Sequence, residues 1–139
     1  MVPIDQRSLR HQLQQEFPEL EMHDWYVQFR ALKASCPDAV LFYRMGEFYE
    51  AFDDDAKLVA EKLGVTLTYK AFATPRGSKN KRQEQRRCPM AGMPYHAVER
   101  HAAALVADGY RVAIAEQTSE TASSKSDIRP RSIFAHGIE

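Results

Sequence analysis

The sequence lacks the features that would assign it to a membrane or a secreted class. No apolar stretch approaches the roughly 18–20 residues of a membrane span, and residues 1–10 contain no apolar core of a signal peptide. The only two cysteines, Cys36 and Cys88, lie far apart, without Cys-x-x-Cys or Cys/His ligand spacing. Nothing in that spacing favours a disulfide. We therefore expect a reduced, cytoplasmic protein that makes no contact with a membrane.

An excess of charge of one sign is missing as well. The chain carries 19 Lys and Arg against 19 Asp and Glu, so its formal net charge is zero. A global field that attracts nucleic acid or an anionic membrane is therefore absent. Any electrostatic signal for such a partner must be local.

One local signal is the stretch 70–87, in which only Glu84 opposes a run of basic side chains. Turn-forming residues between Pro75 and Asn80 argue against regular structure there, so we predict a long basic loop. Loops of this length in compact domains are usually functional or disordered. The stretch is either a solvated surface loop or an arm that contacts DNA phosphates. As a phosphate-contacting arm it would use Lys70, Arg76, Lys79, Lys81, Arg82, Arg86 and Arg87.

The motifs of common nucleotide-binding and hydrolytic sites are also missing. The sequence contains no Gly-x-x-x-x-Gly-Lys-Ser/Thr, Gly-x-Gly-x-x-Gly, Gly-x-Ser-x-Gly or His-Glu-x-x-His. His96 and His101 are five residues apart, and not the three or four that place two metal ligands on one helical face. We expect no ATP binding and no cofactor.

A cluster of carboxylates leaves a metal-dependent nuclease open as an alternative. Glu47, Glu50, Asp53 and Asp55 are close in sequence, and Mg²⁺ needs only one or two carboxylates beside phosphate oxygens. However, acidic residues at 53–55 are favoured at the N-terminus of a helix, where they cap amides and meet the positive end of the dipole. We therefore interpret the run as a helix start and expect no metal site and no enzymatic activity.

The order of predicted elements indicates an α/β fold. The chain has the length of one ordinary domain, and 44% apolar residues supply one core. A reversal at Gly46 makes the first two strands antiparallel, and helical crossovers imply parallel neighbours elsewhere. We expect a small mixed β-sheet flanked by about three α-helices. The predicted helices cover 8–16, 22–35, 53–63 and 94–107, and the predicted strands cover 39–45, 47–52, 65–69, 88–91, 110–116 and an edge strand at 128–135.

Three segments follow from this order. Residues 1–20 are predicted as an appendage, either a docking helix or a frayed end. Residues 21–117 form the domain, with Gly92 at a turn. Residues 118–139 begin with a Ser/Thr-rich flexible connection and include the edge strand.

The stretch 41–52, Leu-Phe-Tyr-Arg-Met-Gly-Glu-Phe-Tyr-Glu-Ala-Phe, organises the rest of the chain. Period-two alternation after Gly46 places Phe48, Glu50 and Phe52 on one face of a strand, opposite Glu47, Tyr49 and Ala51. Composition alone favours a hairpin whose aromatic rings are all core. The alternative is a projecting apolar wedge with a hydrogen-bond acceptor beside it.

Four blocks of sequence carry a family resemblance. They are Phe-Tyr-Arg-Met-Gly-Glu-Phe-Tyr-Glu-Ala-Phe at 42–52, Asp-Asp-Ala-Lys at 54–57, Pro-Met-Ala-Gly-Met-Pro-Tyr-His-Ala-Val at 89–98 and Val-Ala-Ile-Ala-Glu-Gln at 112–117. In this order they resemble the N-terminal mismatch-recognition domain, domain I, of the MutS family of DNA mismatch repair proteins. The resemblance covers 22–117.

The resemblance implies a mixed α/β fold and a DNA-binding role in mismatch repair. It assigns Phe48 to a wedge that enters the minor groove and stacks on a mispaired or unpaired base, and Glu50 to a hydrogen bond with the same base. The implied partners are double-stranded DNA with a mismatch or small bulge, and other repair or replication proteins. A cytoplasmic, nucleoid-associated location follows.

The chain also departs from the family. Its members are several-fold longer and carry connector, lever, clamp and ATPase domains. The family motifs assign no counterpart to residues 1–20. The stretch 70–87 looks longer and more basic than the corresponding family segment. Three interpretations stay open: a free-standing, non-catalytic DNA-binding domain, an interaction or decoy module that modulates repair through protein partners, and an excised fragment of a longer MutS-like protein.

Overall fold

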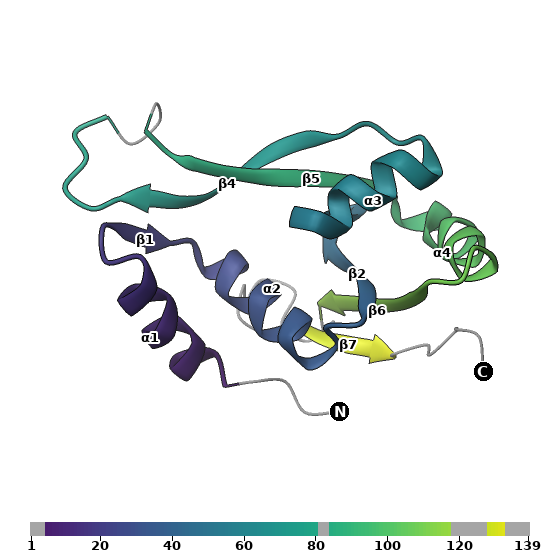
Figure 1. Cartoon of the computed structure of the whole chain (residues 1–139), viewed down its shortest axis with the longest axis horizontal. Helices are drawn as coiled ribbons and strands as arrows, with labels where there is room; N and C mark the ends of the chain where they lie inside the picture. Colours follow the sequence, from purple (N-terminus) through teal and green to yellow (C-terminus); the bar gives the residue numbers. More distant parts are fainter. Residues whose placement is uncertain (1–4, 81–83, 118–127, 133–139) are drawn as a thin grey trace.

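The computed structural model describes residues 5–80, 84–117 and 128–132 (Figure 1). Its elements are arranged around one seven-stranded sheet. In chain order the elements are α1 (Gln6–Glu16), β1 (Leu20–Met22), α2 (Asp24–Ser35), β2 (Ala39–Met45), β3 (Phe48–Phe52), α3 (Asp53–Leu63), β4 (Thr68–Pro75), β5 (Arg86–Pro94), the 3-10 turn η1 (Tyr95–Ala97), α4 (Val98–Ala107), β6 (Arg111–Gln117) and β7 (Ile128–Ser132).

The sheet is mixed, as the sequence predicts. Its strand order is β1-β4-β5-β3-β2-β6-β7. β2 and β6 are parallel, and every other neighbouring pair is antiparallel. The predicted edge strand is confirmed as β7, antiparallel to β6, whereas 133–135 and the predicted flexible connection at 118–127 lie outside the described residues.

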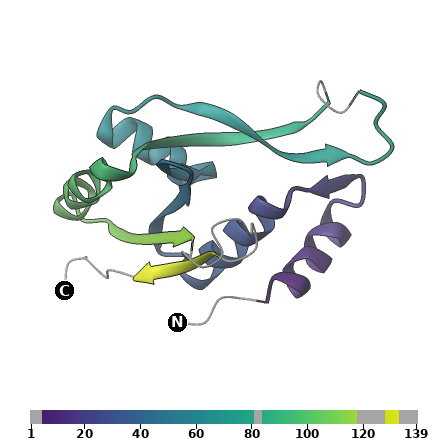
Figure 2. The same cartoon turned by 180° about the vertical axis from the view of Figure 1, so that it is seen from behind.

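Helices cover both faces of the sheet, so the core has two layers (Figure 2). One layer takes its helical side chains from α1 and α2, and the other takes them from α3 and α4. Alternation along β3 divides the aromatic motif between the layers: Tyr49 and Ala51 enter the α3/α4 layer, and Phe52 enters the α1/α2 layer.

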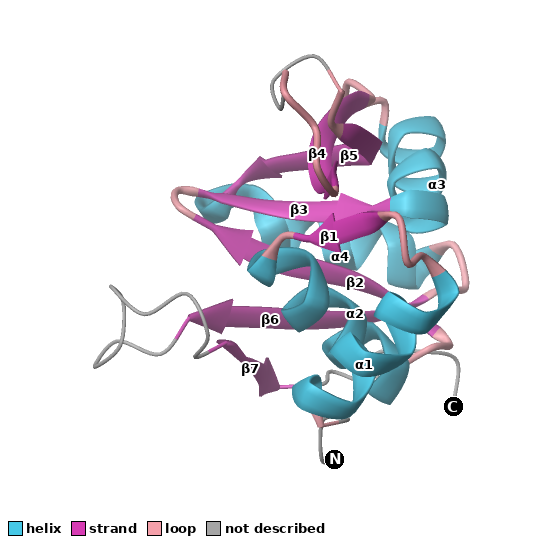
Figure 3. Cartoon of the chain, turned by 90° about the vertical axis from the view of Figure 1, so that its left-hand side faces the viewer, coloured by secondary structure: helices cyan, strands magenta, loops and turns pink. Residues whose placement is uncertain are grey.

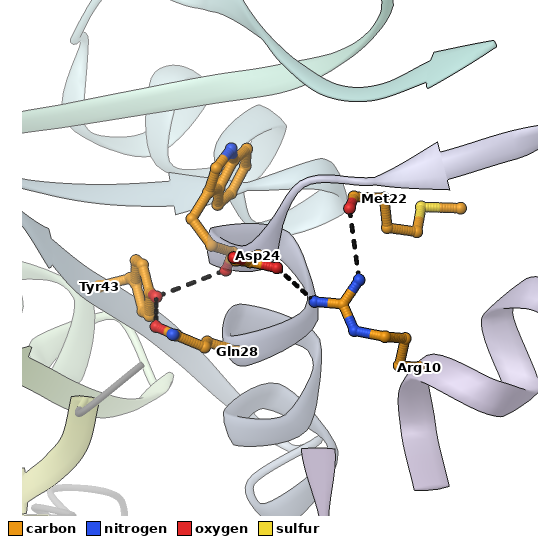
Figure 4. Close-up of polar contacts among 6 residues, drawn as sticks. Arg10, Met22, Asp24, Gln28 and Tyr43 are labelled. Atoms are coloured by element: carbon orange, nitrogen blue, oxygen red, sulfur yellow. Dashed lines mark hydrogen bonds and ion pairs between the residues drawn. The ribbon is translucent and has the colours of Figure 1, made fainter. Parts of the chain in front are cut away.

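Of the predicted N-terminal appendage, residues 5–20 are described, and they pack against the rest of the domain as a docked helix. Leu9 and Leu13 of α1 are buried in the α1/α2 layer. Arg10 donates hydrogen bonds to the Met22 carbonyl oxygen, at 3.5 Å, and to the Asp24 carboxylate, at 2.5 Å (Figure 4). The three-residue strand β1, which pairs with β4, was absent from the sequence prediction because a run so short shows no periodicity.

The prediction of a loop over 70–87 is wrong. Its first residues continue β4 as far as Pro75 and its last two begin β5, so the connection is only 76–85. The turn signals at 75–80 were correct but local. Upstream of them, Ala73 is fully buried and β4 pairs with both β1 and β5, so tertiary pairing overrides the composition.

Two further predictions are corrected. Residues 65–67 precede the strand rather than begin it, because β4 starts at Thr68. Gly92 is not a turn but lies within β5, directly opposite Glu50 of β3.

The acidic run does begin α3, but its carboxylates do not cap the helix as predicted. The N-cap residue is Phe52, without a side-chain capping bond. Asp53 has φ of 57°, a left-handed conformation that Asp tolerates better than most residues, and accepts a hydrogen bond from the Tyr26 hydroxyl. Asp55 accepts from the Leu41 amide at 3.1 Å and pairs with the Lys33 ammonium at 2.9 Å. The run therefore ties α3 to β2 and α2.

Replacing Asp55 by alanine should lower the free energy of unfolding, because it leaves the Leu41 amide without its acceptor. A buried donor without a partner costs about 1–3 kcal/mol. Urea denaturation at neutral pH measures the loss. Asp54→Ala is the control, since Asp54 is exposed in the same first turn and shares only the dipole contribution. Equal losses in the two variants would contradict the tie between α3 and β2.

Candidate nucleic-acid interface

The hairpin β2–β3 presents its tip away from the helices that cover the sheet, as the side view shows (Figure 3). Met45 pairs with Phe48, so the turn consists of two residues, Gly46 and Glu47. Gly46 has φ of 58°, as the first position of a type II′ turn requires. The tip is braced from outside the hairpin by the Tyr95 amide, which donates to the Glu47 carbonyl oxygen at 2.8 Å.

A second brace comes from Arg44 of β2. Its Nε donates to the Gly46 carbonyl oxygen at 2.6 Å. Its guanidinium lies 4.7 Å from the centre of the Tyr95 ring and 5.3 Å from that of Tyr49, within the range of a cation–π contact. Neither Arg44 nor Tyr95 was singled out from the sequence, because their contact joins residues far apart in the chain.

Burial falls steeply along one face of β3. Phe52 is 1% exposed, Glu50 is half-buried and Phe48 is 44% exposed. The cause is Trp25 at the N-terminal end of α2, whose ring lies 4.7 Å from that of Phe52 and closes the core above it. Phe42, in the same motif, is fully buried. The structure therefore places Phe48 and Glu50 together on the uncovered end of the face and assigns Phe42 and Phe52 to packing.

Glu50 pairs with a large residue on one neighbouring strand and with a glycine on the other. On β2 it pairs with Tyr43, which is fully buried and donates its hydroxyl to the Gln28 side chain (Figure 4). On β5 it pairs with Gly92. Burial raises the pKa of the Glu50 carboxyl above its ordinary value, and the positive charge of Lys70 acts in the opposite direction.

The structure describes five of the seven basic residues predicted as backbone contacts, and they are spread along the β4–β5 hairpin. Lys70 lies within the sheet, its ammonium 5.5 Å from the centre of the Trp25 ring, near the Phe48–Glu50 face. Arg76 and Lys79 lie in the connection that follows β4, and Arg86 and Arg87 begin β5 opposite Ala73 and Ala71, so these four residues lie at the end of the hairpin next to that connection. Lys81 and Arg82 lie outside the described residues.

The basic end of the hairpin is well separated from the tip that carries Phe48. β5 has nine residues, with Arg86 at one end and Pro94, the partner of Phe48, at the other. At about 3.3 Å per residue the two ends are roughly 26 Å apart. That is the length of about eight base pairs of duplex DNA, so both ends can reach one duplex but not one nucleotide.

Metal-ligand clusters, disulfides and membrane-spanning helices can be looked for in the part of the chain that the structure describes. There, no three side chains of His, Cys, Asp and Glu gather as a metal site requires, and both cysteines are buried and free. No described helix is long and apolar enough to cross a bilayer.

Comparison with known proteins identifies the family of the chain. The family model for MutS domain I matches residues 24–136, well over half of the chain. The chain belongs to the MutS domain I family.

Relatives at high identity support the same assignment. A protein of Roseiflexus sp. (strain RS-1) named DNA mismatch repair protein MutS is 64% identical over 139 residues, which is 100% of this chain and 12% of that protein. A protein of the same name from Chloroflexus aurantiacus (strain ATCC 29366 / DSM 635 / J-10-fl) is 55% identical over 119 residues, 86% of this chain and 12% of that protein. One from Desulfovibrio desulfuricans (strain ATCC 27774 / DSM 6949 / MB) is 41% identical over 108 residues, 78% of this chain and 11% of that protein.

Two facts follow from these matches. The chain spans about an eighth of the length of the Roseiflexus and Chloroflexus relatives. Residues 1–20, which the MutS motifs left without a counterpart, lie within the match to the Roseiflexus protein.

The environment of Glu50 predicts a pH-dependent effect of Glu50→Gln. Because the pKa of this carboxyl is higher in the folded chain than in the unfolded one, the folded state binds the proton more tightly. Ionised Glu50 therefore lowers stability progressively as pH rises from the ordinary carboxyl range through the raised pKa. Glu50→Gln should be more stable than the parent at pH 7, and this advantage should disappear below about pH 4.

Urea denaturation of both proteins at pH 7 and pH 4 measures the difference. Glu61→Gln, an exposed position on α3, should stay within about 0.5 kcal/mol of the parent at both pH values. An advantage of Glu50→Gln that is the same at both pH values would refute the prediction.

Proposed function

We propose that the chain is a non-catalytic DNA-binding domain that recognises a mismatched or unpaired base in a duplex through Phe48. The observation that carries the proposal is the 44% exposure of this ring on a braced hairpin tip, in a chain that belongs to the MutS domain I family. A large apolar side chain in such a place is well suited to enter a minor groove.

The energetics favour a damaged site over a matched one. Inserting a side chain between base steps unstacks them and kinks the duplex, at a cost of a few kcal/mol. The cost is lowest where pairing is already broken, because less stacking and hydrogen bonding is lost there. Phe48 therefore supplies discrimination through the difference in that cost.

Glu50 is proposed as the polar contact to the same base. It lies two residues from Phe48 on the same face and is half-buried. A carboxylate next to DNA phosphates is unfavourable in general, so Glu50 selects for a base that offers a hydrogen-bond donor rather than adding affinity. The already raised pKa of its carboxyl should rise further beside the phosphates.

The basic end of the β4–β5 hairpin is proposed as a phosphate contact. Arg86 and Arg87 are exposed there, about eight base pairs from the tip. Such contacts add affinity that is independent of sequence and sensitive to salt. In the relatives named MutS, this role would be shared with the rest of a protein about eight times longer.

Phe48→Ala should abolish the preference for a mismatched duplex. Stacking of an aromatic ring on a base contributes about 1–3 kcal/mol, which corresponds to a loss of roughly 5- to 160-fold in that preference. A competition assay at low salt with a matched duplex and one carrying a single unpaired base measures it. Phe17→Ala is the control, because Phe17 is a similarly exposed ring, 39% accessible, at the end of α1.

A chain that binds matched and mismatched duplexes equally, whether or not Phe48 is present, would refute the wedge. Binding to no duplex at all would favour the alternative of an interaction module that acts through protein partners. Divalent-metal-dependent cleavage of the duplex would refute the non-catalytic assignment.

Charge reversal at Arg86 and Arg87 should weaken binding to matched and mismatched duplexes by the same factor. Each lost phosphate contact should flatten the slope of log affinity against log salt by about one. Titrations at several salt concentrations measure both effects. The control for net charge is charge reversal at Lys57 and Arg100. Both are exposed, on α3 and α4, which cover the face of the sheet opposite to that of Phe48 and Glu50. An equal effect of the two double variants would mean that the hairpin makes no local contact.

A further inference from the structure

Gly92 of β5 lies where no other residue type fits. A Cβ atom built on it would be 2.1 Å from the Tyr49 carbonyl oxygen, 2.4 Å from Oε1 of Glu50 and 2.9 Å from the Glu50 Cα. Contacts this short do not occur between non-bonded atoms, so any side chain here requires β3 or the Glu50 side chain to move. By contrast, a Cβ on Gly46, Gly64 or Gly77 would meet no atom within 4 Å.

The close approach involves the backbone of β3 and one side chain, that of Glu50. Gly92 and Glu50 are paired partners on neighbouring strands, and Oε1 of Glu50 reaches the place that a side chain of residue 92 would fill. On the other side of Glu50 that space is taken by the buried ring of Tyr43. The Glu50 carboxylate therefore has room on the β5 side and none on the β2 side.

The glycine also determines the environment of the carboxylate. A group lying against the backbone of β5 loses part of its hydration, which agrees with the half-buried state of Glu50. The backbone of Glu50 is paired with β2 and β5, and its carboxylate lies within the field of the Lys70 ammonium.

We infer that Gly92 is a positioning residue for Glu50: its missing side chain leaves the site over β5 in which the Glu50 carboxylate lies beside Phe48. The inference rests on the proposed function, because it gives Glu50 its place in base recognition. It extends that function to a residue that touches no DNA. Gly92 acts only through Glu50 and through the position of β3.

The wild-type chain offers a test that needs no substitution. Nuclear Overhauser contacts between the Glu50 Hγ protons and the Gly92 Hα protons are expected, because the carboxylate lies against this residue. Their absence would overturn the inference whatever the chain does with DNA.

The second test is Gly92→Ala. The carboxylate should be displaced into solvent, so the pKa of Glu50 measured by NMR should fall toward its ordinary value. The preference for the mismatched duplex should change by the same factor as in Glu50→Ala. In a Glu50→Ala background the same glycine substitution should cause a smaller loss of preference than in the parent, because the contacts with the β3 backbone remain and the contact with the Glu50 carboxylate is gone.

Gly64→Ala is the matched control for a strained glycine position. Gly64 has φ of 71° in the C-cap of α3, so alanine there costs stability, roughly 1 kcal/mol, without meeting any neighbour. It should leave the pKa of Glu50 and the mismatch preference unchanged.

Besides the absence of those Overhauser contacts, three results from the variants would overturn the inference. The first is an unchanged pKa of Glu50 in Gly92→Ala. The second is an equal fall of that pKa in Gly64→Ala. The third is an equal loss of preference from Gly92→Ala with and without the Glu50 side chain, which would mean a purely structural role. A wild-type chain without mismatch preference would instead refute the proposed function, and the NMR measurements would still decide the role of Gly92.

Discussion

The length of sheet face that α2 covers determines which side chains of β3 are available to a partner. Phe48, Glu50 and Phe52 share that face because residues alternate along a strand. The Trp25 ring lies on Phe52 and seals the core there, while the next two positions toward the tip emerge progressively from it. Burial of one aromatic residue and exposure of the other, four residues apart, thus have a single cause: the point at which α2 begins.

The same strand is held on both edges, which gives the exposed ring a firm base. β3 is hydrogen-bonded to β2 on one side and to β5 on the other, and its turn is tied by the Tyr95 amide. A side chain that unstacks bases must sit on a hairpin that deforms less easily than the DNA. Otherwise the hairpin moves and the bases stay stacked. Two flanking strands and an external brace meet that requirement better than an isolated hairpin, which is marginally stable by itself.

Local pattern predicted the parts of the fold and site that depend on neighbours in sequence. The alternation of Phe48, Glu50 and Phe52 gave their shared face, and the turn at Gly46 gave the antiparallel pair. The pattern did not give the exposure of Phe48, because that depends on Trp25 from another element. It also failed at Gly92, since a glycine in a short apolar run marks a turn or a close approach of two backbones equally well. Lys70 was assigned to a loop for a related reason: the turn signals that follow it act over a few residues, whereas pairing with β5 extends the strand.

In the proposed function, affinity and discrimination have separate physical origins. Phosphate contacts from the distal end of the β4–β5 hairpin would stabilise every duplex equally, and contacts from Phe48 and Glu50 would depend on the base beneath them. A chain with zero net charge and few exposed basic residues in one place has little of the first kind. If the proposed function holds, this domain is therefore suited to reading a base more than to binding the duplex backbone. In relatives about eight times longer, most of the holding would fall to surfaces outside this domain. Strong binding by the isolated chain is consequently not needed for Phe48 to discriminate. The ratio of affinities between mismatched and matched duplexes is the quantity that reports its role.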